Sequence, residues 1–217
     1  MTFLEAINAV LRRLREDTVT SSNSTDYSKL IGDFVNQAIN ECEHAWDWNA
    51  LKVEGAVITQ NGVSAYSLST YPVNVIQGIN TTKNWIMKKI PAEYAHRLQK
   101  LTPISDSPYY YWFADNNSSG TAKINLYPTP TGIEVINFLL ISHTGEYNLD
   151  GTSDSSVLEI PSLPIVLNAY ARAVSERGED GGIGYNEADT AYRTALADAV
   201  AIDASLNHLQ ELSWYAV

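Results

Sequence analysis

Cysteine is nearly absent from this chain of 217 residues, which holds Cys42 alone. A single thiol excludes an internal disulfide framework and a cysteine-rich zinc site. No apolar run approaches the roughly 20 residues that a membrane-spanning helix needs. The N-terminal sequence MTFLEAINAVLRRLRED carries its charges after its apolar residues, which is the reverse of a secretory signal. We therefore expect a soluble, non-secreted protein that has no membrane partner.

Basic residues are also scarce. Lysine and arginine total 14 against 25 acidic residues, which gives a net charge of -11. Tight binding of duplex DNA by phosphate neutralisation needs the opposite sign, so this class of function is disfavoured. The charge is uneven, because residues 51–100 hold six basic and two acidic residues. Such an asymmetry can orient a chain between two partners, although solvated surface charge produces it as well.

Phenylalanine and methionine are few, whereas tyrosine and tryptophan number 13 and 5. Tyrosine and tryptophan suit surfaces that become buried against partners, and they are equally favoured in β-strands. The run from Tyr109 to Phe113 would form a stacking platform for bases or sugars if one of its faces were open. Alternation along a strand predicts that at least one face of this run belongs to the core.

The sequence contains no motif that is typical of catalysis or metal binding. The four histidines are scattered without metal-ligand spacing: His44, His96, His143 and His208. The glycine-rich RGEDGGIG follows a helix, as a helix-ending loop does, and it lacks the lysine of a phosphate-binding loop. The acids of the last helix lie off its apolar stripe: Glu187, Asp189, Asp198, Asp203 and Glu211. Cys42 lies on a buried stripe. We expect no catalytic residue, no cofactor, no metal site and no enzymatic activity.

Helical periodicity marks both ends of the chain. Thr2 and Glu5 form a capping box before a first apolar stripe, and Asp26 is the expected N-cap of a second, longer helix. Two further helices follow Pro164, and the second of them carries mostly alanine on its apolar stripe. Each helix has one stripe to bury against the others.

Between these ends the pattern changes to that of strands. The segment VEGAVITQNGVSAYSL predicts a hairpin around Asn61-Gly62, the strongest short turn signal. Pro91 opens a short helix in PAEYAHRLQK. Together with YYYWFA, AKINLYP and IEVINFLLIS, the runs predict six or seven short strands and one helix.

The simplest assembly is an α+β protein in which an antiparallel helical bundle of two N-terminal and two C-terminal long helices carries an inserted β-rich module. The expected divisions are an N-terminal hairpin at 1–50, the β-rich module at 51–144, a loop at 145–162, the C-terminal helices at 163–211 and a tail at 212–217.

Three segments, in their order along the chain, resemble the head-to-tail connector adaptors of tailed bacteriophages, a family of portal-docking adaptors that includes the tail tubular A-like proteins. The segments are LIGDFVNQAINECEHAWDWNAL, the turn INLYPTPTG, and the C-terminal AYARAVSERGEDGG with YRTALADAVAIDASLNHLQELSWYAV. None is a catalytic motif, so the resemblance rests on pattern and order.

This resemblance implies a structural adaptor of the phage neck, assembled in the host cytoplasm and resident in the virion between portal and tail. It would bind the portal protein, copies of itself in a ring of twelve, and tail or nozzle proteins. Genomic DNA would pass through the ring without specific binding. The C-terminal segment, which would reach into the portal, maps onto Trp214, Tyr215, Ala216 and Val217.

Two alternatives remain open at the level of sequence. One is a tail-associated hydrolase of peptidoglycan, in which single Asp or Glu substitutions abolish cleavage. The other is a carbohydrate-binding module that loses glycan binding when Tyr110 or Trp112 is changed.

Overall fold

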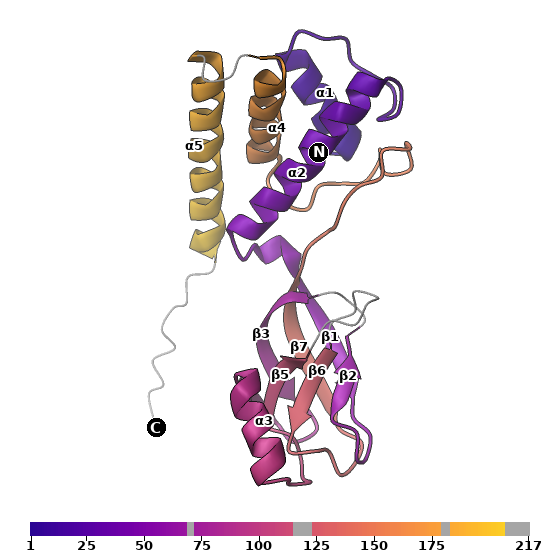
Figure 1. Cartoon of the computed structure of the whole chain (residues 1–217), viewed down its shortest axis with the longest axis vertical. Helices are drawn as coiled ribbons and strands as arrows, with labels where there is room; N and C mark the ends of the chain where they lie inside the picture. The colour runs from indigo at the N-terminus through magenta and orange to yellow at the C-terminus, as the bar shows by residue number, and fades with distance from the viewer. Residues whose placement is uncertain (69–71, 115–122, 179–182, 207–217) are drawn as a thin grey trace. The chain divides into compact units, whose positions relative to one another are not determined.

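A computed structural model of the chain describes residues 1–68, 72–114, 123–178 and 183–206. Its contacts divide the chain into two compact units. The helical unit comprises the residues up to Ala50 and those from Thr144 onward, and the barrel unit comprises Leu51–His143. The helical unit contains α1 (Phe3–Arg13), α2 (Asp26–Ala45), α4 (Ser162–Glu176) and α5 (Ile183–Leu206) (Figure 1).

The first two helices begin at side-chain caps. The predicted capping box of α1 is confirmed: the Glu5 amide donates to Thr2 Oγ1 at 3.2 Å, and the Thr2 amide donates to Glu5 Oε2 at 2.8 Å. The predicted cap of α2 is wrong by one residue. Thr25 is the N-cap and accepts from the Ser28 amide at 2.9 Å. Asp26 instead occupies the first turn, where its carboxylate faces the positive end of the helix dipole.

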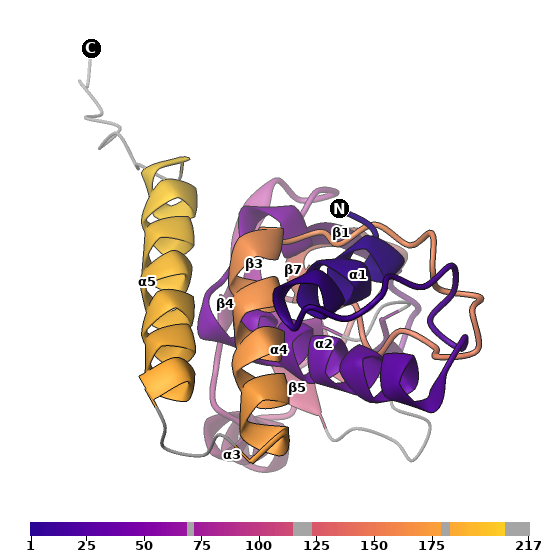
Figure 2. The ribbon, with the colours of Figure 1, turned by 90° about the horizontal axis from the view of Figure 1, so that it is seen from above.

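The centre of the helical unit is α4, which packs against α1, α2 and α5. Figures 1 and 2 show α4 between α5 on one side and α1 on the other. The sequence predicts one apolar face for this helix, but residues 164–169 are buried without interruption. A helix that is apolar on all sides is stable only when other elements surround it.

The predicted fold class is therefore wrong. The described residues form five helices and one seven-stranded mixed sheet that is nearly closed into a barrel, not an antiparallel bundle of four long helices with an inserted β-rich module. Of the four helices that were expected to be long, two are short, since α1 has 11 residues and α4 has 15. The physical reason is the all-round burial of α4, around which the other helices gather instead of pairing stripe to stripe as two hairpins.

The described residues of the barrel unit form seven strands, where the sequence predicted six or seven, and one helix, α3 (Ala92–Leu101). The strand order in the sheet is β1-β7-β3-β4-β5-β6-β2. All neighbouring strands are antiparallel except β4 and β5, which are parallel and are connected through α3. The strands are β1 (Lys52–Ile58), β2 (Ala65–Ser67), β3 (Pro72–Asn80), β4 (Trp85–Lys89), β5 (Tyr110–Ala114), β6 (Lys123–Tyr127) and β7 (Val135–Ser142).

Chain length explains why this sheet curls. The two edge strands, β1 and β2, are consecutive in sequence. In a flat sheet six strand spacings of ~4.8 Å would separate them by ~29 Å. The stretch from Ile58 to Ala65 reaches at most ~25 Å when fully extended. The sheet therefore cannot be flat, and its curvature is consistent with the nearly closed barrel.

The same connection corrects the predicted hairpin. A turn does form at Asn61-Gly62, where Gly62 has a φ of 76° in the left-handed region. However, β1 pairs with β7, and β2 pairs with β6. The Gly62 amide donates to the Pro130 carbonyl at 2.9 Å. The turn thus carries the chain from one sheet edge to the other instead of joining two paired strands.

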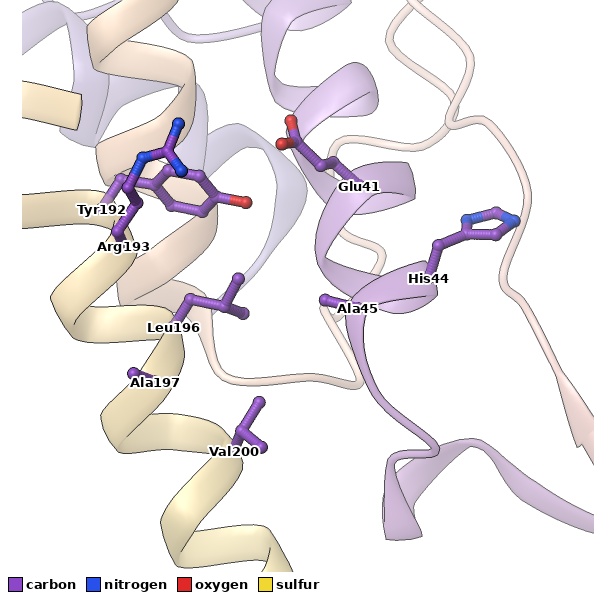
Figure 3. A pocket seen from close by; sticks show the side chains of 8 residues that line it. All are labelled: Glu41, His44, Ala45, Tyr192, Arg193, Leu196, Ala197 and Val200. Carbon is purple, nitrogen blue, oxygen red and sulfur yellow. The ribbon is translucent and has the colours of Figure 1, made fainter. Parts of the chain in front are cut away.

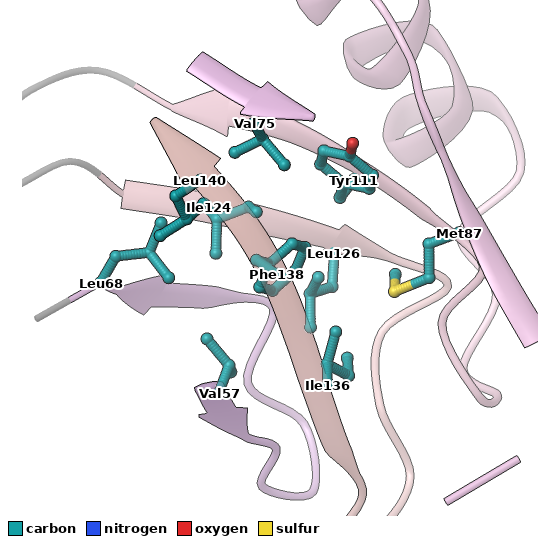
Figure 4. Close-up of a cluster of buried hydrophobic side chains, with 10 residues drawn as sticks. All are labelled: Val57, Leu68, Val75, Met87, Tyr111, Ile124, Leu126, Ile136, Phe138 and Leu140. Carbon is teal, nitrogen blue, oxygen red and sulfur yellow. The ribbon is translucent and has the colours of Figure 1, made fainter. Parts of the chain in front are cut away.

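Aromatic and aliphatic side chains fill the barrel (Figure 4). Phe138 is fully buried, and its ring meets the Tyr111 ring edge to face at 5.4 Å. On the opposite face of β5, Trp112 packs with Ala95 of α3 and with Tyr127. The predicted alternation along β5 is confirmed, and both of its faces are covered.

Candidate functional site: the surface around α5

The predicted portal-binding residues Trp214, Tyr215, Ala216 and Val217 lie outside the described residues. The same holds for Glu211 and His208. The structure does describe α5, the helix that precedes this tail and that ends at Leu206.

The C-terminal end of α5 is tied to the tryptophan-rich turn that follows α2. The Trp46 indole donates its Nε1–H to Asp203 Oδ2 at 3.0 Å. The Asn49 amide donates to the same oxygen at 3.2 Å, and the Asn49 side chain donates to the Asp203 carbonyl at 3.3 Å. One carboxylate thereby fixes the last turns of α5 against a turn some 150 residues earlier in the chain.

The second tryptophan of this turn has a different role. Trp48 is 1% exposed and donates its Nε1–H to the Cys42 carbonyl at 2.8 Å, near the end of α2. This hydrogen bond satisfies a carbonyl that the ending helix leaves without an intrahelical partner. Cys42 is buried as predicted, and burial together with the charge of Glu41 raises the pKa of its thiol to about 12. A thiol with this pKa is a poor nucleophile at neutral pH.

Removing the Asp203 carboxylate tests this attachment. We expect Asp203→Ala to lower the free energy of unfolding by about 1–3 kcal/mol, because two donors lose their acceptor. Amide hydrogen exchange in the last two turns of α5 should accelerate as well. The control is Asp198→Ala, an exposed acid on the same helix. Equal exchange rates in the two variants would contradict the assignment.

A groove of about 570 Å³ lies between α2 and α5 (Figure 3). Glu41 on α2 and Tyr192 on α5 face one another across one end, and Leu196 and Val200 line the other end. Burial would raise the pKa of Glu41, but hydrogen bonds from Asn168 and Arg172 outweigh it and hold this pKa below its ordinary value. Glu41 is therefore an ionised structural carboxylate.

A second groove, of about 560 Å³, lies between α4 and α5. Its lining is almost entirely apolar or small and includes Leu163, Leu167, Ala195 and Ile202. Leu163 is 54% exposed and Ile202 is 67% exposed. Large apolar side chains that remain exposed beside a groove are typical of a surface that another protein covers.

Glu43 is a buried acid that the sequence analysis missed. It is 3% exposed on α2 and accepts hydrogen bonds from the Thr144 amide, at 3.1 Å to Oε2, and from the Thr144 hydroxyl. Burial raises its pKa to about 7, and repulsion from Glu159 adds to the effect, whereas the Thr144 hydrogen bond and His44 oppose it. The only sequence signal was its place beside Cys42 on the buried side of the helix.

The remaining acids and histidines do not converge. Within the described ranges, no three His, Cys, Asp or Glu side chains are grouped so that they could hold a metal ion. Asp189 pairs with Arg193 at 2.8 Å, Asp203 anchors α5, and Glu187 and Asp198 are exposed. Among the same residues, no helix is long and apolar enough to cross a membrane.

The two aromatic residues expected to bind a glycan, Tyr110 and Trp112, do not form an open stacking surface. Trp112 is 6% exposed beneath α3, and Tyr110 packs against the same cluster. The turn INLYPTPTG has a structural role, since Tyr127 donates its hydroxyl to the Thr102 carbonyl and so ties β6 to the end of α3.

The exposed apolar side chains beside the α4–α5 groove favour a contact with another protein. Comparison with known families agrees. The sequence model of the SU10 adaptor protein family matches residues 1–211, so the chain belongs to that family of phage structural adaptors. No curated protein matches the chain.

Proposed function

We propose that this protein forms a ring in the phage neck, docks beneath the portal, extends the DNA channel and provides the platform to which tail proteins attach. The observation that carries the proposal is the family match over residues 1–211, together with the resemblance to head-to-tail connector adaptors. The partners would be the portal protein, further copies of this chain (twelve in the expected ring) and tail or nozzle proteins.

The distribution of charge supports a channel that does not bind DNA. The helical unit holds 20 of the 25 acidic residues and 7 of the 14 basic ones, whereas the barrel unit holds 5 and 7. Negative charge repels the phosphate backbone, and a ring of copies multiplies the field near its surface. DNA that passes such a ring experiences repulsion rather than phosphate neutralisation.

The C-terminal residues supply the proposed portal contact. Two aromatic side chains, Trp214 and Tyr215, stand among the last four residues, and large aromatics are frequent anchors of protein interfaces. The last turns of α5, which precede these residues in the sequence, are held by the contacts of Asp203.

Truncation after Ser213 tests this function. We expect the full-length protein, mixed with the portal of the same phage, to give a stoichiometric ring by light scattering. The truncated protein should bind the portal at least ~10-fold more weakly, because interface aromatics commonly contribute 2 kcal/mol or more.

The control is Leu206→Ala, a change of one exposed residue that leaves the four terminal residues in place. Unchanged docking by the truncated protein would refute the role of the tail. A full-length protein that stays monomeric with the portal would refute the proposed function itself.

A further inference from the structure

One side of the helical unit is formed by α5 and the edge of α4. It carries the apolar groove between these helices, with Leu163 and Ile202 exposed at one end. Asp198 lines that groove, and Glu187 lies nearer to the start of α5. Both acids are exposed, and neither forms an ion pair with any residue that the structure describes.

The side of the same unit that faces away from α5 includes α1, with the start of α2 beside it (Figures 1 and 2). Three arginines at its C-terminal end, Arg12, Arg13 and Arg15, are exposed and make no ion pair within the described part of the chain. Near its other end, Met1 and Val157 are 47% and 62% exposed. Glu16, which pairs with Arg177, and the exposed Asp17 follow the arginines, so this end keeps a net positive charge, whereas the other end is apolar.

Hydrogen bonds and shared pockets show which end of α1 lies at the same end of the helical unit as the start of α5. Arg177, at the end of α4, donates to the Leu14 carbonyl at 3.5 Å and to Glu16 at 2.6 Å, so α4 and α1 end together. Ser175 near the end of α4 lines one pocket with Tyr185 and Asp189, so the first turns of α5, with Glu187, lie at that end. The three arginines and Glu187 thus lie at the same end of the unit.

The apolar residues lie together at the other end. Leu163 and Ile202 line one groove, which places the start of α4 beside the last turns of α5. The Leu158 amide donates to the Met1 carbonyl at 3.0 Å, and Thr2 forms a β-bridge with Val157. The exposed residues Met1 and Val157 therefore lie together at the start of α1. In the sequence, Val157 comes shortly before α4.

We propose that the α5 side of one copy binds the α1 side of the next copy, head to tail. In this arrangement the arginines of α1 meet Glu187 of the neighbour, and Met1 and Val157 cover the end of its apolar groove, which Asp198 lines. The inference rests on the self-association that the proposed function requires, and it assigns the surfaces that make it.

The chemistry favours a head-to-tail contact over a two-fold one. A two-fold dimer brings the same patch of both copies together, so an α1 side would meet an α1 side and its arginines would not reach the acid of α5. A contact between two different patches on opposite sides pairs unlike charges and repeats from copy to copy until a ring closes. Sideways displacement of a copy, without inversion, keeps the charged ends level with each other.

Charge reversal tests the pairing. Variant A carries Arg12→Glu, Arg13→Glu and Arg15→Glu, and variant B carries Glu187→Lys, the exposed acid that lies level with these arginines. Each variant alone brings like charges together, and we expect its assembly on the portal to be roughly tenfold weaker or worse. An equimolar mixture should regain the wild-type ring mass by light scattering, because copies that alternate around the ring restore every contact.

Two controls separate this interface from loss of folding and from unspecific charge effects. A chain with both sets of changes should assemble by itself, since its two sides remain complementary. Lys83→Glu, Lys88→Glu and Lys100→Glu change the net charge as much as variant A does, on exposed residues of the barrel unit, and should leave assembly intact. Circular dichroism verifies that each variant is folded.

The possible failures are distinguishable. Normal assembly of variants A and B would refute this interface and leave the adaptor function standing. Weak assembly that neither the mixture nor the fully reversed chain restores would refute the head-to-tail pairing. Failure of the wild-type chain to assemble, alone or on the portal, would refute both this interface and the proposed function.

Discussion

Phe138→Ala is expected to lower the free energy of unfolding of the barrel unit by about 3–5 kcal/mol, the usual cost of emptying a fully buried phenylalanine site. Phe138 lies on β7, which pairs with both β1 and β3, so its side chain contributes to the middle of the barrel core. The neighbouring backbone is adapted to the ring: a Cβ on Gly78 would lie 2.8 Å from Phe138 Cε1. Little can move in to fill the space that alanine would leave.

Urea unfolding measures this effect, and the control is Ile133→Ala. Ile133 is 77% exposed, so its truncation should change the free energy of unfolding by no more than about 0.5 kcal/mol. A loss below about 1 kcal/mol for Phe138→Ala would show that the barrel interior is packed differently.

The second large effect concerns pH and Glu43. The pKa of Glu43 lies near 7 in the folded protein, above its ordinary value of 4.5. The folded state therefore holds this proton more tightly than the unfolded state does. The stabilisation is complete below about pH 4.5 and is lost as pH rises to about 7, which amounts to about 2–3 kcal/mol.

Glu43→Gln removes this titration while its amide oxygen still accepts from Thr144. We expect the loss of stability between pH 5 and pH 8 to be smaller in the variant by about 2–3 kcal/mol, as measured by urea unfolding at both pH values. Glu41→Gln is the matched control, because the pKa of Glu41 is lowered and its carboxylate stays ionised throughout this range. A Glu43→Gln protein with the wild-type pH dependence would disprove the raised pKa.

Local features of the fold were predictable from the sequence because they depend on residues close together in the chain. The capping box at Thr2, the helix that follows Pro91 and the alternation along Tyr109–Phe113 are of this kind. The start of α2 was displaced by one residue, since Thr25 and Asp26 are both good caps and only Thr25 is followed by serine at the third helical position.

Pairing over long distances was not predictable in the same way. Alternating residues in β1 define a buried face, but they do not indicate that its partner is β7 rather than β2. In the same way, the stripe of α4 did not reveal that helices would cover its other faces. The predicted fold class was wrong for this reason: it depends on which strands pair and which helices pack together, not on where each element lies in the sequence.

The candidate surface shows the same division. The sequence identified the acids of the last helix, but it did not distinguish the exposed Asp198 from Asp203, whose partners Trp46 and Asn49 lie about 150 residues away. The grooves beside α5 arise from tertiary packing, so no local sequence pattern predicts them.

The turn at residues 59–64 has a consequence for a protein that gathers in many copies. Strands at the rim of an open sheet offer unpaired amides and carbonyls, which can recruit the same strand of a neighbouring molecule into a growing aggregate. Here the two edge strands, β1 and β2, are connected by only the six residues 59–64, which keep the two edges of the sheet close to each other. When many identical chains gather at one site, they therefore associate through their folded surfaces and not by pairing their edge strands.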